Sequence, residues 1–381
     1  MEHIRRIFEN FGPRSPGSEG ERRCQEYLAG ELSQAGLEPR LETFPVAQKA
    51  FMAVPAICNG LALVAALLYW LFPPAAACLA ALAVVIFGLE VVLYRHVLTM
   101  IFPKEESRNL YAVIKPRKEM RRRLIFGGHA DAAYEWRYHQ ASPKTFKAIA
   151  GFILLSAPWL FLASVMRGFI FTGVHGRWID WTVLIAGLGA VLGLFFTRFS
   201  VVAPGAVDNL SGAVLGVAVA RAIRRSGAEW DHTEIVVLVC GSEEAGLCGA
   251  KAFAKRHKAQ WQDAPTAYIA LDSFRELPHF HVYNRDMNGR VHHDRALCDL
   301  LQRAGRDCGL ELAYATVTVG ASDAAAFTQA GIPAALLCSM DPAPAHYYHT
   351  RRDAWPILDQ ECLRQVARVI VAAIERYDAL L

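Results

Sequence analysis

The sequence of 381 residues predicts an α/β fold, in which a mixed and mostly parallel sheet is flanked by helices and two transmembrane helical hairpins are inserted into the domain. Three observations predict it. Hydrophobic residues make up 54% of the chain and charged residues only 20%, against about 45–50% and about 25% in soluble proteins. The apolar residues gather in uncharged windows. The remaining sequence alternates short apolar runs with helical patterns, so we expect a polar domain combined with membrane-embedded segments.

Residues 1–50 are predicted to be the N-terminal part of the polar domain. They carry charges throughout, and residues 17–46 fit a helix followed by a strand. They contain no apolar run of the length that a secretory signal peptide needs. The formal net charge of +4 is small and dispersed, which argues against a nucleic-acid partner.

The first hairpin is predicted over residues 51–102. No charged residue lies between Lys49 and Glu90. The pair Pro73-Pro74 divides this window into spans near 52–72 and 75–94, because a double proline cannot continue a helix. Each span has about the 20 residues that cross the hydrocarbon core of a bilayer.

The second hairpin is predicted over residues 147–197. Its two uncharged windows are 148–166 and 181–197. Buried core helices of a globular domain are the alternative interpretation. Two independent pairs of such windows favour four membrane spans.

A hairpin returns the chain to the side that it left, so residues 1–50, 103–146 and 198–381 are expected on one face of the membrane. Basic residues flank the spans on that face: Lys49, Arg95, Lys104, Lys144, Lys147 and Arg198. The opposite face has only the Phe72–Pro74 turn and a loop holding Arg167 and Arg177. The positive-inside rule therefore predicts an integral membrane protein, in the inner membrane of a cell, with a cytoplasmic polar domain. Nine cysteines without a Cys-x-x-Cys pair agree with reduced thiols in that compartment.

Outside the hairpins, the sequence predicts strands at 124–128, 234–240, 267–271 and 334–338, with helices at 211–225 and 245–257. Such alternation is typical of a largely parallel sheet covered by helices. Ligands of these sheets bind beyond the carboxyl ends of the strands. Carboxylates and imidazoles follow each predicted strand, which makes this edge the candidate site.

Each polar residue at this edge also has an ordinary interpretation. His129 and Asp131 lie two apart in an extended segment and fit either a metal ligand with its partner or a simple hydrogen bond. Asp208 precedes a helix and could be its N-cap. Asp272 could be a ligand or a hydrogen-bond anchor.

Glu243 and Glu244 are adjacent carboxylates after a buried strand. Like charges repel unless a positive charge offsets them, so a divalent ion explains the pair better than a charged loop does. His349 supplies a last imidazole near the C-terminus. Together these residues favour a metal site.

Six sequence blocks occur in a specific order: HAD (129–131), PGAVDNLSG (204–212), GSEEAGLCGAKAF (241–253), ALDSF (270–274), GASDAAAF (320–327) and YYHT (347–350). In this order the chain resembles metallopeptidase family twenty-eight of clan MH, the family of di-zinc aminopeptidases, glutamate carboxypeptidase II and glutaminyl cyclases. The resemblance spans roughly 107–131 and 204–355, so both hairpins fall in gaps between blocks. It implies a zinc-exopeptidase-like fold.

Carried over position by position, the resemblance implies two Zn²⁺ ions. Asp208 would bridge them, with His129 and Asp272 completing one site and Glu244 and His349 the other. Glu243 would be the general base, Asp131 would orient His129, and Tyr348 would hydrogen-bond the tetrahedral oxyanion. His346 competes for the last ligand position, but the spacing to Thr350 and Asp353 matches His349 better.

One position departs from the family pattern, because Ala324 follows Ser322-Asp323 where many members have a histidine. That position concerns substrate contacts and not the metals. The resemblance implies a zinc exopeptidase, an aminopeptidase in the first instance, and the uncharged windows predict that it is membrane-embedded. The second hairpin interrupts the stretch between His129 and Asp208, so we expect a substrate presented at the membrane, as a hydrophobic peptide or a fragment of a membrane protein. Simple anchoring with a soluble peptide substrate is the alternative. A glutaminyl-cyclase-like acyl transferase and a non-catalytic receptor or scaffold are the alternatives, and the complete ligand set argues against both.

Overall fold

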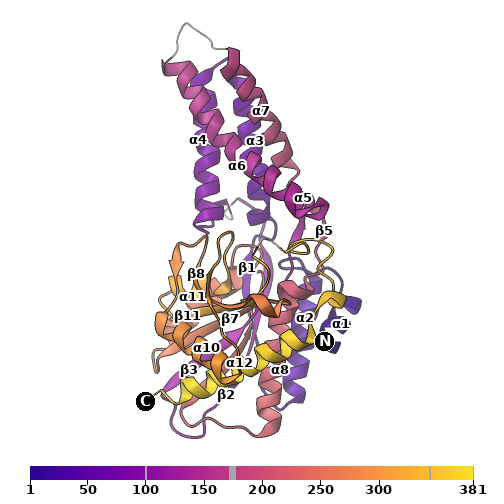
Figure 1. Ribbon diagram of the computed structural model, residues 1–381, viewed down its shortest axis with the longest axis vertical. Coiled ribbons are helices and arrows are strands. Elements are labelled where there is room, and N and C mark those ends of the chain that lie inside the picture. Colours follow the sequence, from indigo (N-terminus) through magenta and orange to yellow (C-terminus); the bar gives the residue numbers. More distant parts are fainter. Residues whose placement is uncertain (99–100, 171–176, 343–344, 381) are drawn as a thin grey trace. The chain divides into compact units, whose positions relative to one another are not determined.

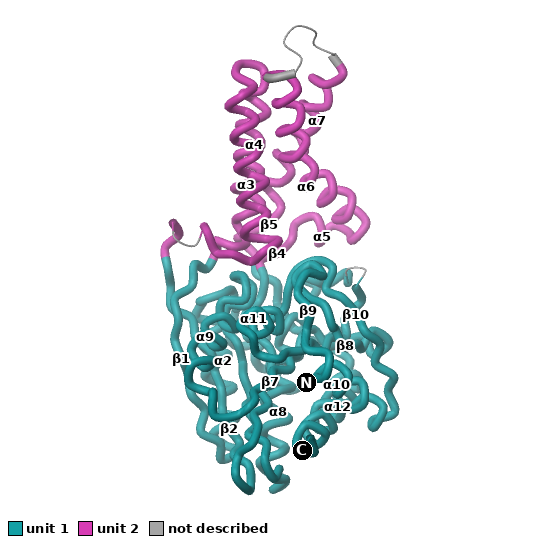
Figure 2. Tube along the Cα trace, turned by 90° about the vertical axis from the view of Figure 1, so that its left-hand side faces the viewer, with its two compact units in different colours: residues 1–48, 104–133, 202–381 teal, residues 49–103, 134–201 magenta. Residues whose placement is uncertain are grey.

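The computed structural model describes residues 1–98, 101–170, 177–342 and 345–380 and divides into two compact units (Figures 1 and 2). The sheet unit comprises residues 1–48, 104–133 and 202–381, and the helical unit comprises residues 49–103 and 134–201. Residues 134–146 and 198–201, which were expected in the polar domain, group instead with the helices. Most of the loop predicted between Arg167 and Arg177 lies outside the described residues.

The sheet unit contains one mixed sheet with the strand order β1-β2-β6-β3-β7-β11-β8-β10, to which β9 adds at β8. Its strands are β1 (Arg40–Val46), β2 (Glu105–Ile114), β3 (Arg122–Gly127), β6 (Thr233–Val239), β7 (Thr266–Phe274), β8 (Phe280–Asp286), β9 (Val291–His292), β10 (Tyr314–Thr316) and β11 (Ala334–Ser339).

The four strands predicted from the sequence are β3, β6, β7 and β11, and they are neighbours in the sheet. They pair in parallel in the order β6-β3-β7-β11. Antiparallel strands extend this centre, with β2 beside β6 and β8 beside β11. The predicted mixed, mostly parallel sheet is therefore confirmed, and its parallel centre brings four carboxyl ends to one edge.

Helices cover both faces of the sheet. They are α1 (Glu2–Asn10), α2 (Glu19–Gln34), α8 (Ser211–Ser226), α9 (Cys248–Gln260), α10 (Arg295–Asp307), α11 (Asp323–Gln329) and α12 (Gln360–Asp378), with the short helical turns η4 (Ala206–Leu210), η5 (Leu277–His279) and η6 (Trp355–Ile357). Helices α8, α10 and α12 lie on one face and α9 and α11 on the other.

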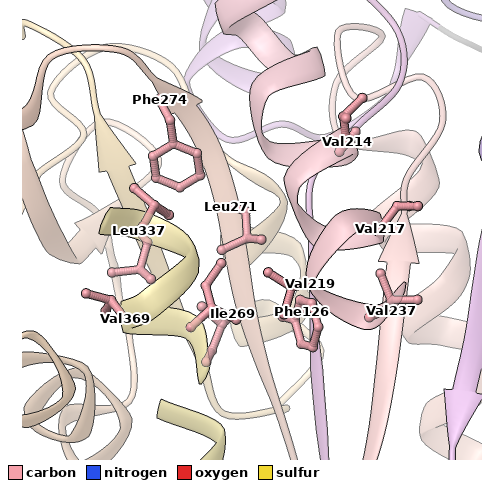
Figure 3. Close-up of a cluster of buried hydrophobic side chains, with 14 of the residues drawn as sticks. Phe126, Val214, Val217, Val219, Val237, Ile269, Leu271, Phe274, Leu337 and Val369 are labelled. Atoms are coloured by element: carbon pink, nitrogen blue, oxygen red, sulfur yellow. The ribbon is translucent and has the colours of Figure 1, made fainter. Parts of the chain in front are cut away.

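Large aliphatic and aromatic side chains fill the core between the sheet and α8 and α12 (Figure 3). Phe126 of β3 and Ile269 of β7 are fully buried there, against Val217 of α8 and Val369 of α12. The short apolar runs of the sequence are thus the central strands, which are buried on both faces.

The helical unit is built from two antiparallel helix pairs. Its elements are α3 (Ala50–Leu68), α4 (Pro73–Phe87), η1 (Gly88–Val92), β4 (Tyr134–Trp136), α5 (Arg137–Ala141), α6 (Pro143–Val165), η3 (Met166–Ile170), α7 (Arg177–Leu194) and β5 (Thr197–Val202). The strands β4 and β5 pair with each other, outside the main sheet.

Small side chains form the interior of the helical unit, and large ones face outward. Its main buried cluster is rich in alanine, from Ala62 of α3 to Ala190 of α7. Of the 24 large hydrophobic side chains that are exposed among the described residues, 20 belong to this unit. Apolar surface of that extent is expected where lipid, and not water, surrounds the helices.

Three of the four helices that are long and apolar enough to cross a membrane belong to the helical unit: 50–68, 73–92 and 143–168. The fourth, 206–226, contains α8 and is 78% buried, against 28–39% for the others, which identifies it as a core helix of the sheet unit. The predicted span at 181–197 corresponds to a shorter apolar helix at 178–194, because β5 begins at Thr197.

Candidate metal centre

The candidate site lies at the carboxyl edge of the parallel strands. His129 and Asp131 follow β3, Glu243 and Glu244 follow β6, and a bridge between His129 and Cys240 joins the two segments. Asp272 does not follow its strand as expected, since β7 continues to Phe274 and pairs Asp272 with Cys338. Asp272 therefore lies two residues before the end of β7, at the same edge of the sheet.

Two groups of three side chains have the spacing of metal ligands, and Asp208 belongs to both. His129, Asp208 and Asp272 form one group, and Asp208, Glu244 and His349 form the other. Oδ1 of Asp208 lies 3.3 Å from Nε2 of His129, and Oδ2 lies 3.2 Å from Nε2 of His349. The two oxygens of one carboxylate therefore face two different imidazoles, which is the arrangement of a bridging ligand.

The loop before α8 fixes Asp208 in this orientation. Asp208 lies in η4, and Leu210, not Asp208, occupies the N-cap position of α8, so the N-cap interpretation is wrong. The carboxylate of Asp353 accepts the backbone N–H groups of Val207 at 2.7 Å and Asp208 at 3.0 Å. Asp353 therefore holds the backbone while the Asp208 side chain points at the two histidines.

Asp131 holds the glutamate loop in the same way. Its two oxygens accept the backbone N–H groups of Glu243 at 3.0 Å and Glu244 at 2.9 Å. Its Oδ1 also lies 3.3 Å from Nδ1 of His129. One buried carboxylate thus contacts the segments that carry a ligand of each group, and it positions them through their backbone and through the imidazole.

The side chains of the site are buried and many are carboxylates, and both features shift the pKa values of its residues. Burial, reinforced by neighbouring carboxylates, raises the pKa of Glu243 well above its ordinary range and that of Asp272 to about 8. Burial alone would lower the pKa of His349, but Glu244 and Asp208 outweigh it and raise the value to about 10. These three side chains bind their protons more tightly, because few positive charges offset the buried carboxylates.

A divalent cation in each group would supply that missing charge, and the donor atoms fit one. Oε1 of Glu244 is buried and lies 3.2 Å from Nε2 of His349, yet it has no hydrogen-bond partner among the described residues. A buried acceptor without a donor is costly unless a cation fills the role. Imidazole nitrogen and carboxylate oxygen are zinc ligands, so the residues present fit two zinc ions.

The remaining predicted residues lie beside these groups. Oε2 of Glu243 is 3.8 Å from Nε2 of His129, and Glu243 belongs to neither ligand group. The ring of Tyr348 stacks on that of His349 with centroids 4.0 Å apart. His346 is exposed and lies in neither group, which removes it as the rival for the last ligand position.

Arg14 is a buried residue of the site that sequence reasoning missed. It is 2% exposed, and its guanidinium donates to the backbone carbonyls of Ala130 at 2.9 Å, Pro204 at 2.8 Å and Gly205 at 2.9 Å. These carbonyls belong to the loops that carry His129 and Asp208. Every residue has a backbone carbonyl, so no sequence pattern indicates that Arg14 binds these three.

Glu21 was also missed, and its local pattern is misleading. Ser18-x-x-Glu21 at the start of α2 is typical of a capping box, and Ser18 does accept the N–H of Glu21. The Glu21 carboxylate, however, accepts the N–H of Ser242 at 2.5 Å and the hydroxyl of Ser107 at 3.0 Å. It therefore fixes the residue before Glu243 and not only the helix end.

The block Ser322-Asp323-Ala324 lies at the start of α11, where Ser322 is the N-cap. Asp323 is buried, and its Oδ1 has no hydrogen-bond partner within the described part of the chain. Ala324 is fully buried in the place where many relatives are expected to carry a histidine. The departure from the family pattern therefore concerns none of the five residues of the two ligand groups.

Comparisons with known proteins agree with this geometry. Residues 192–374 match the family model of Peptidase family M28. No curated protein matches the chain significantly.

Solved structures share the fold at low sequence identity. The zinc aminopeptidase BSAP of Bacillus subtilis is 13% identical, with a TM-score of 0.58 over 99% of this chain and 93% of that one. The LapA aminopeptidase of Legionella pneumophila is 16% identical, with a TM-score of 0.56 over 100% and 71%. The glutaminyl cyclase of Porphyromonas gingivalis is 14% identical, with a TM-score of 0.55 over 99% and 96%. The family match identifies residues 192–374 as a part of Peptidase family M28, and the fold and the two ligand groups agree with a zinc metallopeptidase.

Proposed function

We propose that this chain is a membrane-embedded, zinc-dependent exopeptidase, an aminopeptidase that acts at the cytoplasmic face of the membrane. The observation that carries the catalytic part is the position of Asp208, whose two oxygens face His129 and His349 at 3.3 and 3.2 Å. A carboxylate shared between two ligand groups supports a two-metal site. Aminopeptidases among the solved structures of similar fold favour removal of residues from the amino end.

Zinc, when bound, polarises a carbonyl and lowers the pKa of a bound water. In the proposed reaction Glu243 takes the proton of the attacking water and passes it to the nitrogen of the scissile bond, which leaves as an amine. Glu243 lies 3.8 Å from the proposed ligand His129 and belongs to neither ligand group, which suits a base that acts on a bound water. Asp131 keeps Glu243 in place through its backbone N–H.

Tyr348 is the proposed donor to the oxygen of the tetrahedral intermediate. Its ring lies against His349, so its hydroxyl group belongs to the same neighbourhood. Burial and the surrounding carboxylates raise its pKa well above the ordinary value. The hydroxyl therefore stays protonated and able to donate a hydrogen bond at neutral pH.

The helical unit supports the membrane part of the proposal. Its outward-facing side chains are large and apolar, whereas its buried side chains are small. This is the reverse of a soluble helical bundle. Basic residues flank the predicted spans at one side, which favours a cytoplasmic sheet unit.

The second insertion interrupts the chain between His129 and Asp208, two ligands of one group. It leaves the sheet unit after Ala133 and returns at Val202, four and six residues from these ligands. This covalent proximity supports a substrate that is presented at the membrane, as a hydrophobic peptide or a fragment of a membrane protein. Simple anchoring with a soluble peptide substrate is the competing hypothesis.

A glutaminyl-cyclase-like acyl transferase is the second candidate, because one structural neighbour is a glutaminyl cyclase. The complete ligand set, with Asp272 and His129 beside Asp208, favours the peptidase over it and over a non-catalytic receptor.

Digestion of a mixed peptide library by the purified full chain in detergent tests the proposal. Mass spectrometry should show residues lost one at a time from the amino end. Peptides with N-terminal glutamine that lose ammonia instead would support the cyclase. Glu243→Gln is the matched variant, and it should lower turnover by about 10²–10⁴-fold while retaining zinc. Loss of zinc in this variant would mean that Glu243 is a ligand, and an unaltered library with wild-type protein would support the receptor.

A further inference from the structure

One end of the helical unit carries exposed cations that have no carboxylate within ion-pair distance among the described residues. We call these residues the basic collar: Lys49, Arg95, Arg137, Lys144 and Lys147. The start of α3 and the end of α7 meet here, because Thr197 donates to the carbonyl of Met52 at 3.2 Å. The segment after η1 joins them through the ring contact of Phe51 with Tyr94, whose centroids are 5.0 Å apart. Helix α5 and β5 lie at this same end of the bundle (Figure 1).

The helical unit has two carboxylates of its own at this end, and both are buried. They are Glu90 and Glu135, and each is 1% exposed. Glu90 accepts the backbone N–H of Leu98, and Glu135 lies 3.7 Å from Arg198, which is not part of the collar. Within the described residues, no collar cation lies within ion-pair distance of a carboxylate.

The opposite end of the bundle is neutralised by an internal pair. Arg167 lies 3.2 Å from Asp180, and the hydroxyl of Tyr69 lies 3.3 Å from the same carboxylate. The guanidinium also lies over the rings of Tyr69 and Trp70. Among the described side chains the two ends therefore differ, because Arg167 is paired with Asp180 and the collar cations have no carboxylate within ion-pair distance.

Aromatic rings lie beside the residues of the basic collar, at the ends of the helices. Trp136 stacks on Phe146 with centroids 5.3 Å apart, and Phe146 lies between Lys144 and Lys147 in the first turns of α6. The Arg137 guanidinium lies over the ring of Phe195, which is 53% exposed. Aromatic rings beside cations, next to a lipid-facing apolar surface, are typical of the headgroup level of a bilayer.

We propose that the basic collar binds the phosphate headgroups of anionic phospholipids. Lysine ammonium and arginine guanidinium groups bind phosphate oxygens strongly, and the outward-facing Leu154 and Leu155 later in α6 supply the apolar surface that acyl chains would cover. A soluble anion would use the cations alone, whereas a phospholipid uses both features. This inference rests on the membrane embedding proposed above.

The test compares the full chain in nanodiscs of phosphatidylcholine alone and of phosphatidylcholine with phosphatidylglycerol. Native mass spectrometry counts the lipids that stay bound after release from the disc. Wild-type protein should retain phosphatidylglycerol in preference to phosphatidylcholine. The triple variant Arg137→Gln, Lys144→Gln, Lys147→Gln should lose that preference, by roughly fivefold in affinity for each charge and on the order of 100-fold in total.

A matched triple variant removes the same charge from exposed cations of the sheet unit: Lys115→Gln, Arg121→Gln and Lys255→Gln. It should keep the preference for phosphatidylglycerol. Equal binding of both lipids by wild type, or an equal loss in both triple variants, would overturn the proposal. So would competition by free glycerol phosphate, which would indicate a site for a soluble anion. Failure of the membrane embedding itself would look different, because the chain would then stay in solution without detergent or nanodiscs.

Discussion

The sheet unit and the helical unit place their side chains in opposite ways. In the sheet unit the large residues, such as Phe126 and Ile269, are buried, and the charged groups that enter the interior meet backbone or histidine partners at the strand ends. In the helical unit alanine fills the interior, and leucine and tryptophan face outward. The difference is the one expected if water surrounds the first unit and lipid the second, as proposed above. Water drives large apolar groups inward, whereas helices in lipid associate through small side chains that allow close backbone approach.

The largest expected effect concerns the charged interior of the sheet unit. Asp208→Ala removes the carboxylate that both ligand groups share, so both zinc ions should be lost together. Without them kcat/KM should fall by roughly 10³-fold or more, since metal polarisation contributes several kcal/mol to such reactions. Elemental analysis of the purified variant gives the zinc content for each chain.

Asp378→Ala is the matched control for Asp208→Ala. Asp378 also accepts two successive backbone N–H groups, those of Asp231 and His232, each at 3.0 Å, but it lies away from the ligands. It should cost about 1 kcal/mol of stability and leave zinc bound. Loss of one ion alone in Asp208→Ala would contradict the bridging role.

The next effect tests the outward face of the helical unit. Leu155 is 68% exposed near the middle of α6, and Val319 is 74% exposed in the sheet unit. A lysine at the centre of a membrane span costs about 2.5–3.5 kcal/mol, whereas a surface substitution in water changes stability by about 0.5 kcal/mol or less. Leu155→Lys should therefore reduce the fraction of protein recovered in membranes, and Val319→Lys should not. Equal recovery of the two variants would argue against lipid around the helices.

The same contrast explains which parts of the structure could be predicted. The runs that became β3, β6, β7 and β11 are apolar, and β6 is also rich in β-branched residues. Their length and pattern are local properties of the sequence. The uncharged windows were equally visible. Helix α8 resembles a membrane span in length and hydropathy, and only its 78% burial against the sheet separates it from one.

The missed parts depend on contacts between distant segments. Arg14 bonds to carbonyls 116 to 191 residues away, and Glu21 bonds to an N–H group 221 residues away. Any residue type offers such backbone groups, so the partner leaves no mark on the sequence. The assignment of residues 134–146 to the helical unit was missed for a related reason, because β4 and α5 are polar segments that belong there through their pairing and packing alone.

A smaller effect tests the interior of the helical unit. A Cβ atom on Gly193 of α7 would lie 2.1 Å from Cγ of Asn59, whose side chain is held by a 2.7 Å hydrogen bond to the carbonyl of Pro55. Gly193→Val should therefore separate α7 from α3 and cost about 1–3 kcal/mol. Gly151→Val is the control in the same unit, since a Cβ atom there meets nothing within 4 Å. Thermal unfolding in detergent compares the two variants, and equal midpoints would mean that close approach of the helices is not what stabilises the bundle.

The smallest effect concerns Arg14, a cation that crosses between the two ligand loops. Its three hydrogen bonds hold the segment after His129 against the segment before Asp208, so it should set the distance between two ligands of one ion. Arg14→Met keeps much of the volume and removes every donor, and we expect zinc affinity to fall by about 10–100-fold, as for other residues that orient ligands. Arg14→Lys restores the charge with a single ammonium group and should recover part of that loss.

Arg123 separates this positioning role from a general need for a buried arginine. It is 3% exposed and pairs with Glu234 and Asp263 near the amino ends of the parallel strands, at the edge of the sheet away from the ligands. Arg123→Met should lower the free energy of unfolding by about 3–5 kcal/mol, the cost of breaking a buried ion pair, and leave zinc affinity unchanged. Titration of the apo-protein with zinc, at a temperature where each variant is folded, compares the affinities. If both arginine variants weaken zinc binding equally, Arg14 stabilises the unit without positioning the ligands. Its hydrogen bonds to the two loops would then affect zinc affinity no more than an ion pair at the far edge of the sheet does.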